Sequence, residues 1–132
     1  MKIKHFLTGL TAIIVCTASA SAADLSVIAN SGLPINASEI KDIFLGSKQF
    51  SGSTKIVPVD NSAAQDEFLS KVLKMDTGKY STLWAKKSFR DGLNPPAVKS
   101  SDAEVVEFVR RTPGAVGYVK NSHGGVNIIK KY

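Results

Sequence analysis

Residues 97–119 read AVKSSDAEVVEFVRRTPGAVGYV and place a helix start, a helix end and a strand in one short stretch. Ser101 followed by Glu104 is the pattern of a capping box, in which the serine hydroxyl accepts a hydrogen bond from the Glu104 amide and the carboxylate turns back toward the cap. Apolar residues then recur at the spacing of one helix face: Val105, Phe108 and Val109. The pattern predicts a helix that begins after Ser101.

The same stretch ends its helix abruptly and continues as a strand. Pro113 cannot continue a helix, and Gly114 tolerates the left-handed backbone that is typical of a helix exit. The residues that follow, AVGYV at 115–119, are predicted to form a short buried strand. A helix, a tight stop and an apolar strand make one αβ unit, and the natural setting of such a unit is a sheet covered by helices.

Similar units precede this stretch. We predict strands over 25–29, 55–59 and 97–99, helices capped by Asn36 and Ser62, a helix with an aromatic stripe from Tyr80 toward Phe89, a polar loop over 47–54 and a last strand over 126–129. The order favours an α/β layer with a mixed sheet and flanking helices. The sequence leaves open whether the last strand joins this sheet or reaches toward a neighbouring chain.

Residues 1–22 have the layout of a secretory signal peptide: two lysines near the start, a short apolar middle and small residues at the end. We predict cleavage after Ala22 and a periplasmic location. An uncleaved membrane anchor is the weaker alternative, because the apolar run is shorter than the roughly 20 residues that span a bilayer. A lipoprotein signal at Cys16 is disfavoured because two bulky residues precede it.

The expected mature chain, residues 23–132, has the length of one domain. It contains no cysteine, which excludes a disulfide, a thiolate nucleophile and a cysteine-ligated metal. Loss of Lys2 and Lys4 lowers the 17 basic residues to 15 against 11 acidic ones, so its formal charge is +4. This charge favours anionic partners modestly. The basic residues are spread along the chain and do not interleave with aromatic ones, which argues against nucleic acid.

The segment VPVDNSAAQ at 57–65 is the strongest candidate for a binding site. It places a strand end directly before a capped helix, where free backbone N–H groups and the helix dipole attract an anion. We predict that Ser62 and Gln65 form a capping box and that the amides of residues 63–65 are exposed. A plain helix cap is the open alternative. A hydrolase is disfavoured, because no serine lies in a nucleophile elbow and His123 is the one histidine of the mature chain.

Several stretches resemble a known family. TPGAVGYV at 112–119 is similar to the Thr-Pro-Gly-Ala-Ile-Gly-Tyr-Val segment of the phosphate-binding proteins, the solute receptors of bacterial phosphate ABC importers, which have the type 2 periplasmic binding protein fold. LSVIANSGLPINASEIKDIFLGSKQF at 25–50 and KIVPVDNSAAQDEFLSKVL at 55–73 resemble two further segments, in the family's order. The resemblance implies a single-lobe, three-layer α/β sandwich of this type.

The resemblance also implies a ligand and a site. Ser62, Ala63, Ala64 and Gln65 match the family's Ser, second Gly, Thr and Arg, and with Asn61 they form the implied binding segment for inorganic phosphate or a similar oxyanion. No cofactor, metal or enzymatic activity is implied. The implied partners are an ABC importer permease or a second chain that completes the cleft, since we expect this chain to lack the opposing lobe.

Two of these positions depart from the family pattern. Ala64 lacks the hydroxyl of the family's threonine, and Gln65 lacks the charge and the two-pronged grip of an arginine. Asp66 and Glu67 place negative charge at the same helix start, which opposes a bound anion. The alternative function is therefore a receptor-derived protein-interaction module that no longer captures phosphate.

Overall fold

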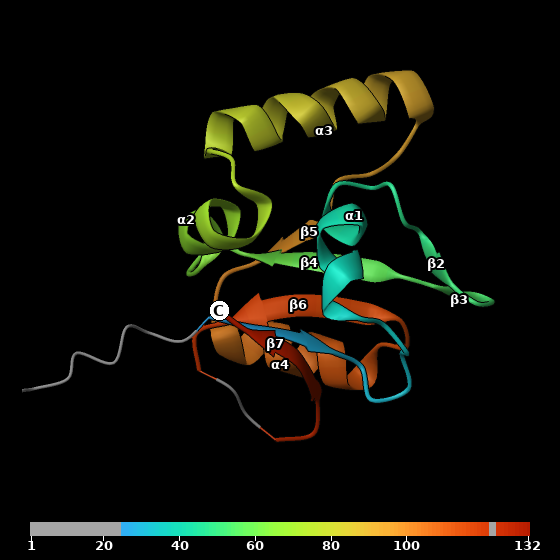
Figure 1. Cartoon of the computed structure of the whole chain (residues 1–132), viewed down its shortest axis with the longest axis vertical. Helices are drawn as coiled ribbons and strands as arrows, with labels where there is room; N and C mark the ends of the chain where they lie inside the picture. Colours follow the sequence, from blue (N-terminus) through green and yellow to red (C-terminus); the bar gives the residue numbers. More distant parts are fainter. Residues whose placement is uncertain (1–24, 122–123) are drawn as a thin grey trace, which may run out of the picture.

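The structure is a computed structural model that describes residues 25–121 and 124–132. The predicted signal peptide and His123 lie outside these residues. A five-stranded sheet in the order β5-β4-β6-β1-β7 forms the centre of the molecule (Figure 1). Its strands are β1 (Ser26–Ala29), β4 (Val57–Asn61), β5 (Ala97–Lys99), β6 (Ala115–Val119) and β7 (Asn127–Lys131). β4 runs parallel to β5 and β6, whereas β1 is antiparallel to β6 and β7, so the sheet is mixed as predicted.

Helices and helical turns connect these strands. They are η1 (Ala37–Glu39), α1 (Ile40–Phe44), α2 (Gln65–Phe68), the π-helical turn η2 (Leu69–Leu73), α3 (Thr77–Asp91) and α4 (Asp102–Arg111). A separate small hairpin consists of β2 (Phe50–Ser51) and β3 (Thr54–Lys55). Its residues were predicted to be a loop, because two-residue strands carry no periodic signal. Among the described residues, no helix has the length and apolar character needed to cross a membrane.

The stretch over 97–119 folds largely as predicted. Ser101 caps α4, and its Oγ accepts a hydrogen bond from the Glu104 amide at 3.2 Å. The second half of the capping box differs, since the Glu104 carboxylate accepts hydrogen bonds from the amide and hydroxyl of Ser100. Gly114 adopts a φ of +83° at the exit, and β6 follows with every residue buried.

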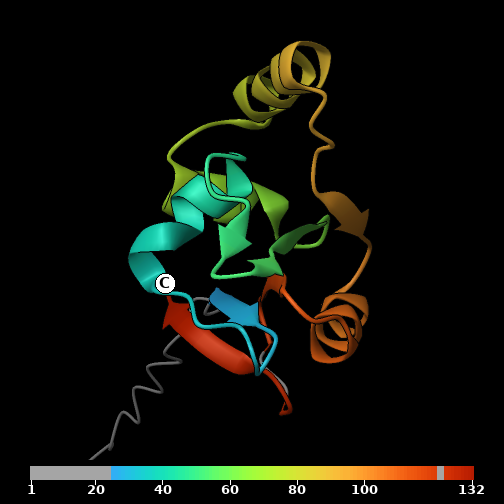
Figure 2. The same ribbon diagram turned by 90° about the vertical axis from the view of Figure 1, so that its right-hand side faces the viewer.

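Alternation along the strands builds two cores, one on each face of the sheet. Val116 and Tyr118 of β6 join the larger core beneath α1, α2 and η2. Ala115 and Val119 of the same strand join the smaller core beneath α4. α4 packs closely there, because a Cβ placed on Gly117 would lie 2.6 Å from a methyl carbon of Val105. The result is the expected three-layer arrangement (Figure 2).

β4 and α3 differ in part from the prediction, and the place of the last strand is now defined. β4 spans Val57–Asn61 rather than 55–59, so the strand includes Asp60 and Asn61. The last strand joins the main sheet as an edge strand beside β1, which answers the question left open by the sequence. The predicted aromatic stripe on α3 ends at Trp84, since Phe89 is 96% exposed.

α3 stands apart from the body of the molecule (Figure 2). Only two of its side chains are buried, Tyr80 and Trp84. The Trp84 indole N–H donates a hydrogen bond to the Phe44 carbonyl at 3.1 Å, and the Lys87 ammonium donates to the Leu45 carbonyl. The helix is therefore held by a few side chains, and cavities lie beneath it.

Candidate functional site

The carboxyl end of β4 is organised by Asn61, which is fully buried. Its Nδ2 donates hydrogen bonds to Oδ1 of Asp102 at 2.7 Å and to the Tyr118 carbonyl at 3.0 Å. Its Oδ1 accepts a hydrogen bond from the Ala63 amide at 3.0 Å. Asn61 thus joins the end of β4 to α4 and β6, and its polar atoms are committed to protein partners.

The amides that were predicted to be free for an anion are largely occupied. The Ser62 amide donates to the Lys99 carbonyl at 2.9 Å and extends the pairing of β4 with β5. The Ala63 amide donates to the Asn61 side chain, and the Ala64 amide donates to the Asn61 carbonyl at 3.0 Å. The prediction that the amides of residues 63–65 are exposed is therefore wrong for Ala63 and Ala64, because the chain makes a tight turn there before the helix begins.

The helix start also lies later than predicted. α2 begins at Gln65, and its N-cap is Ala64, which has no side-chain acceptor. The predicted capping box of Ser62 with Gln65 does not form, because Ser62 sits two residues before the cap. Ser62 and Ala63 are exposed, Ala64 is buried and Gln65 is half-buried. Gln65 lines a cavity of about 320 Å³ between β4, β5 and α3.

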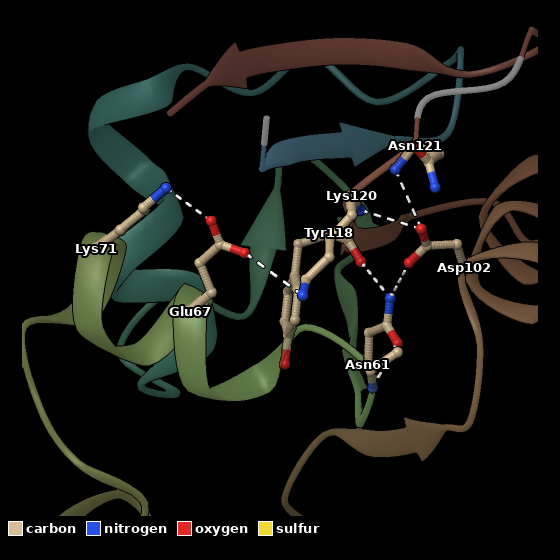
Figure 3. A network of polar contacts seen from close by, with 8 residues as sticks. Asn61, Glu67, Lys71, Asp102, Tyr118, Lys120 and Asn121 are labelled. Carbon is tan, nitrogen blue, oxygen red and sulfur yellow. Dashed lines mark hydrogen bonds and ion pairs between the residues drawn. The ribbon is translucent and has the colours of Figure 1, made fainter. Parts of the chain in front are cut away.

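A carboxylate of the chain itself lies at the carboxyl ends of β4 and β6. Asp102, the first residue of α4, accepts the Asn61 side chain on Oδ1. Its Oδ2 accepts hydrogen bonds from the amides of Lys120 at 3.2 Å and Asn121 at 3.1 Å (Figure 3). The Asp102 carboxylate therefore accepts hydrogen bonds from three donors at the carboxyl ends of the strands, where α/β proteins commonly bind ligands.

Charged side chains continue this network on α2 and η2. Glu67 forms an ion pair with Lys71 at 2.6 Å and lies 3.8 Å from the Lys120 ammonium (Figure 3). Both pairs are partly exposed, so their contribution to stability is small. They do reduce the positive charge that Lys120 offers to an external anion.

Another acid at this end of β4 is Asp60, which is buried at 2% exposure, whereas Asp102 is half-buried. Its two carboxylate oxygens accept hydrogen bonds from the hydroxyls of Tyr80 and Tyr118, each at 2.8 Å. Burial raises the pKa of Asp60 to about 6, although the two hydroxyls lower it. Burial and the neighbouring carboxylate raise the pKa of both tyrosines. Asp60 thus links α3, through Tyr80, to the centre of the sheet.

Tyr118 connects these groups to the core. Its ring stacks on Phe68 with ring centroids 3.9 Å apart, its hydroxyl reaches Asp60 and its carbonyl accepts from Asn61. None of Asp60, Asp102 and Tyr118 was predicted to be a site residue. Asp102 looks like an ordinary acid in the first turn of a helix, and Tyr118 looks like core. Their roles depend on the pairing of β4 with β6, which a local pattern does not encode.

The described residues contain no cluster of three or more His, Cys, Asp or Glu that could hold a metal ion. His123 and Cys16 lie outside them. The geometry at the carboxyl end of β4 is that of a polar network beside the exposed Ser62 and Ala63 and the half-buried Gln65. Such an arrangement supplies hydrogen-bonding contacts.

Comparison with known proteins supports the fold. An ABC-type phosphate transport receptor from Vibrio cholerae matches 80% of this chain at a TM-score of 0.51 and 17% sequence identity. PstS from Borrelia burgdorferi matches the same share at a TM-score of 0.47 and 19% identity. The matched region is 45% and 46% of those chains, so this chain aligns with about half of each receptor. No protein-family model and no curated protein matches the sequence.

Proposed function

We propose that this chain is a non-enzymatic, exported binding module of the phosphate-receptor type that supplies one wall of an oxyanion site. The observation that supports the proposal most is the alignment of 80% of the chain with 45% of a phosphate transport receptor. In open α/β sheets, ligands bind at the carboxyl ends of the strands. In this chain that edge contains the segment from Asn61 to Gln65.

The geometry defines how such a wall would contact the ligand. The Ser62 amide is bonded to β5 and the amides of Ala63 and Ala64 hold the turn, so we assign the contact with phosphate or a similar oxyanion to the Ser62 hydroxyl and the Gln65 carboxamide. Two neutral groups on one surface bind an anion weakly in water. A second chain or an ABC importer permease would complete the cleft and exclude water.

The first step of this proposal is export. Protein recovered from the periplasmic fraction is expected to begin at Ala23, because Ala20 and Ala22 form the small-residue cleavage pattern. Intact-mass measurement checks this directly. A recovered chain that still begins at Met1, or that remains with the membrane fraction, would contradict both the cleavage and the periplasmic location.

Phosphate binding is testable with substitutions at Gln65. Titration of the exported protein with phosphate, followed by amide chemical shifts, is expected to show binding in the millimolar range. Gln65→Arg is expected to tighten it about tenfold, because a charged, two-pronged donor replaces a neutral one. Gln65→Glu is expected to abolish it. Ser53→Arg adds the same charge on the exposed β2–β3 turn and is expected to change nothing. Equal affinities for Gln65→Arg and Gln65→Glu would refute this site.

The Asp102 network favours a second candidate function, a receptor-derived module that contacts a protein partner and captures no phosphate. In this reading the internal carboxylate permanently occupies the donors at the strand ends. Asp102→Asn removes its charge while retaining one acceptor oxygen. Phosphate shifts that appear only in Asp102→Asn, and not in the unmodified protein, would favour the second function over the first.

A further inference from the structure

The structure contains a cavity of about 410 Å³ at the opposite end of β4 from Asn61. It lies at the amino ends of β4 and β5, where Pro58 and Ala97 line it. Its other walls come from the end of α1, the segment before β4, the connection over 92–96 and Trp84 of α3. In Figure 1 this is the region where the chain leaving α3 descends past α1 toward β5.

The chemistry of the lining is apolar with a positive rim. The apolar part is formed mainly by Ile43, Ile56, Pro58, Trp84, Leu93 and Pro96. Two lysines, Lys48 and Lys55, also line the cavity, and none of its lining residues is an aspartate or glutamate. Lys48 is paired with Glu39 at 3.5 Å, whereas Lys55 makes no ion pair within the described part of the chain. The cavity thus offers apolar surface together with an ammonium group.

The walls are held in place before any ligand arrives. The Trp84 indole is 6% exposed and donates its N–H to the Phe44 carbonyl. Gly46 packs against it so closely that an added Cβ would lie 2.8 Å from the ring. The Ile56 amide donates to the Gln49 carbonyl at 2.9 Å, and two consecutive prolines stiffen the opposite wall. Preformed, mostly apolar cavities of 300–1,000 Å³ with a few polar groups are typical small-molecule sites.

We propose that this cavity binds a small amphipathic anion, with a flat apolar body against Trp84 and a carboxylate or sulfonate near Lys55. The site is separate from the oxyanion wall of the proposed function, because it lies at the opposite end of β4. Inorganic phosphate lacks the apolar body and is not its ligand. Trp84, Pro95 and Pro96 also line the cavity beside Gln65, so the substitution at Lys55 described below distinguishes this site from phosphate binding at Gln65.

Trp84 is the one tryptophan of the chain, so its fluorescence reports binding of an energy acceptor. Because Trp84 also lines the cavity beside Gln65, the substitutions below assign the signal to one cavity. The probe is 8-anilinonaphthalene-1-sulfonate, an amphipathic anion that accepts energy from tryptophan. Its matched neutral analogue is N-phenyl-1-naphthylamine, which lacks the sulfonate. We expect saturable transfer from Trp84 to the anionic probe at one site, with at least tenfold weaker binding of the neutral analogue. Phosphate in excess is expected not to compete.

Substitutions locate the site and its charge. Lys55→Gln is expected to weaken binding of the anionic probe at least fivefold and to leave binding of the neutral analogue unchanged. Lys130→Gln on β7 is expected to change neither affinity. Ala97→Phe narrows the cavity and is expected to abolish binding of both probes. Phe89→Ser removes an aromatic ring that is 96% exposed and is expected to leave binding intact. The proposal is overturned by loss of binding in Phe89→Ser, by equal affinity for both probes, or by no saturable transfer below 1 mM.

Discussion

Gly114→Ala is expected to destabilise the protein by about 3–4 kcal/mol, which is a large share of the stability of a small domain. Two effects add at this position. Gly114 has a φ of +83°, a conformation that costs a residue with a Cβ about 1–2 kcal/mol. In addition, a Cβ built on Gly114 would lie 2.1 Å from the Lys55 carbonyl oxygen, so the backbone itself would have to move. Urea unfolding of the purified variant measures the loss.

Gly92→Ala is the matched control for this effect. Gly92 has a similar φ of +67° after α3, but a Cβ there would have nothing within 4 Å. It therefore isolates the conformational cost, and we expect a loss of only about 1 kcal/mol. If the two variants lose equal stability, the contact between the α4–β6 turn and residue 55 does not contribute.

The turn at Gly114 shows why much of the fold could be predicted from the sequence. The turn at Thr112–Gly114 is a local signal, and its consequence is also local: α4 must end and β6 must begin. The alternation of apolar residues then assigned faces, because Val116 and Tyr118 point to one core and Ala115 and Val119 to the other. Signals of this kind depend on neighbours in the chain and survive without knowledge of the tertiary structure.

The candidate site was harder to predict, because its geometry depends on distant pairing. The segment NSAAQ contains a cap residue, small residues and a glutamine, and these features suggested a helix start with open amides. Pairing with β5 draws the Ser62 amide to the Lys99 carbonyl, and Asn61 bonds across to Asp102, 41 residues away. The helix therefore begins at Gln65 and not directly after Ser62, where it was predicted to begin. A prediction of open amides needs the strand order as well as the local sequence.

The same distant contacts change how well the carboxyl ends of β4 and β6 can bind an anion. In the sequence, the features that weaken an anion site are the departures at Ala64 and Gln65 and the negative charges of Asp66 and Glu67. With the structure, the larger effect is the carboxylate of Asp102, which already holds the Lys120 and Asn121 amides. The hydrogen bonds of Asp102 and Asn61 keep β4, β6 and α4 together. Under the proposed function, this surface would therefore need a partner to hold phosphate.

Asp60→Asn is expected to make the protein more stable relative to the unmodified chain as the pH rises from about 4 to about 6. The carboxyl has an ordinary pKa of 3.8, and burial raises this pKa to about 6 in the folded protein. Between these values the folded state binds more protons than the unfolded state, so stability falls as the pH rises. The full penalty is present above pH 6. Asparagine does not titrate, so the penalty is absent from the variant.

The size of the effect follows from the pKa difference of about two units, which corresponds to a penalty on the order of 3 kcal/mol. Urea unfolding of both proteins at pH 4 and pH 7 measures it as the change in their stability difference. The lowered pKa values of Glu39 and Glu104 make stability rise with pH. This contribution is the same in both proteins, so it cancels in their stability difference. Asp42→Asn, at an exposed position of α1, is the control for the loss of one carboxyl group at the surface. A stability difference between Asp60→Asn and the unmodified protein that stays constant with pH would show that Tyr80 and Tyr118 fully compensate the buried charge.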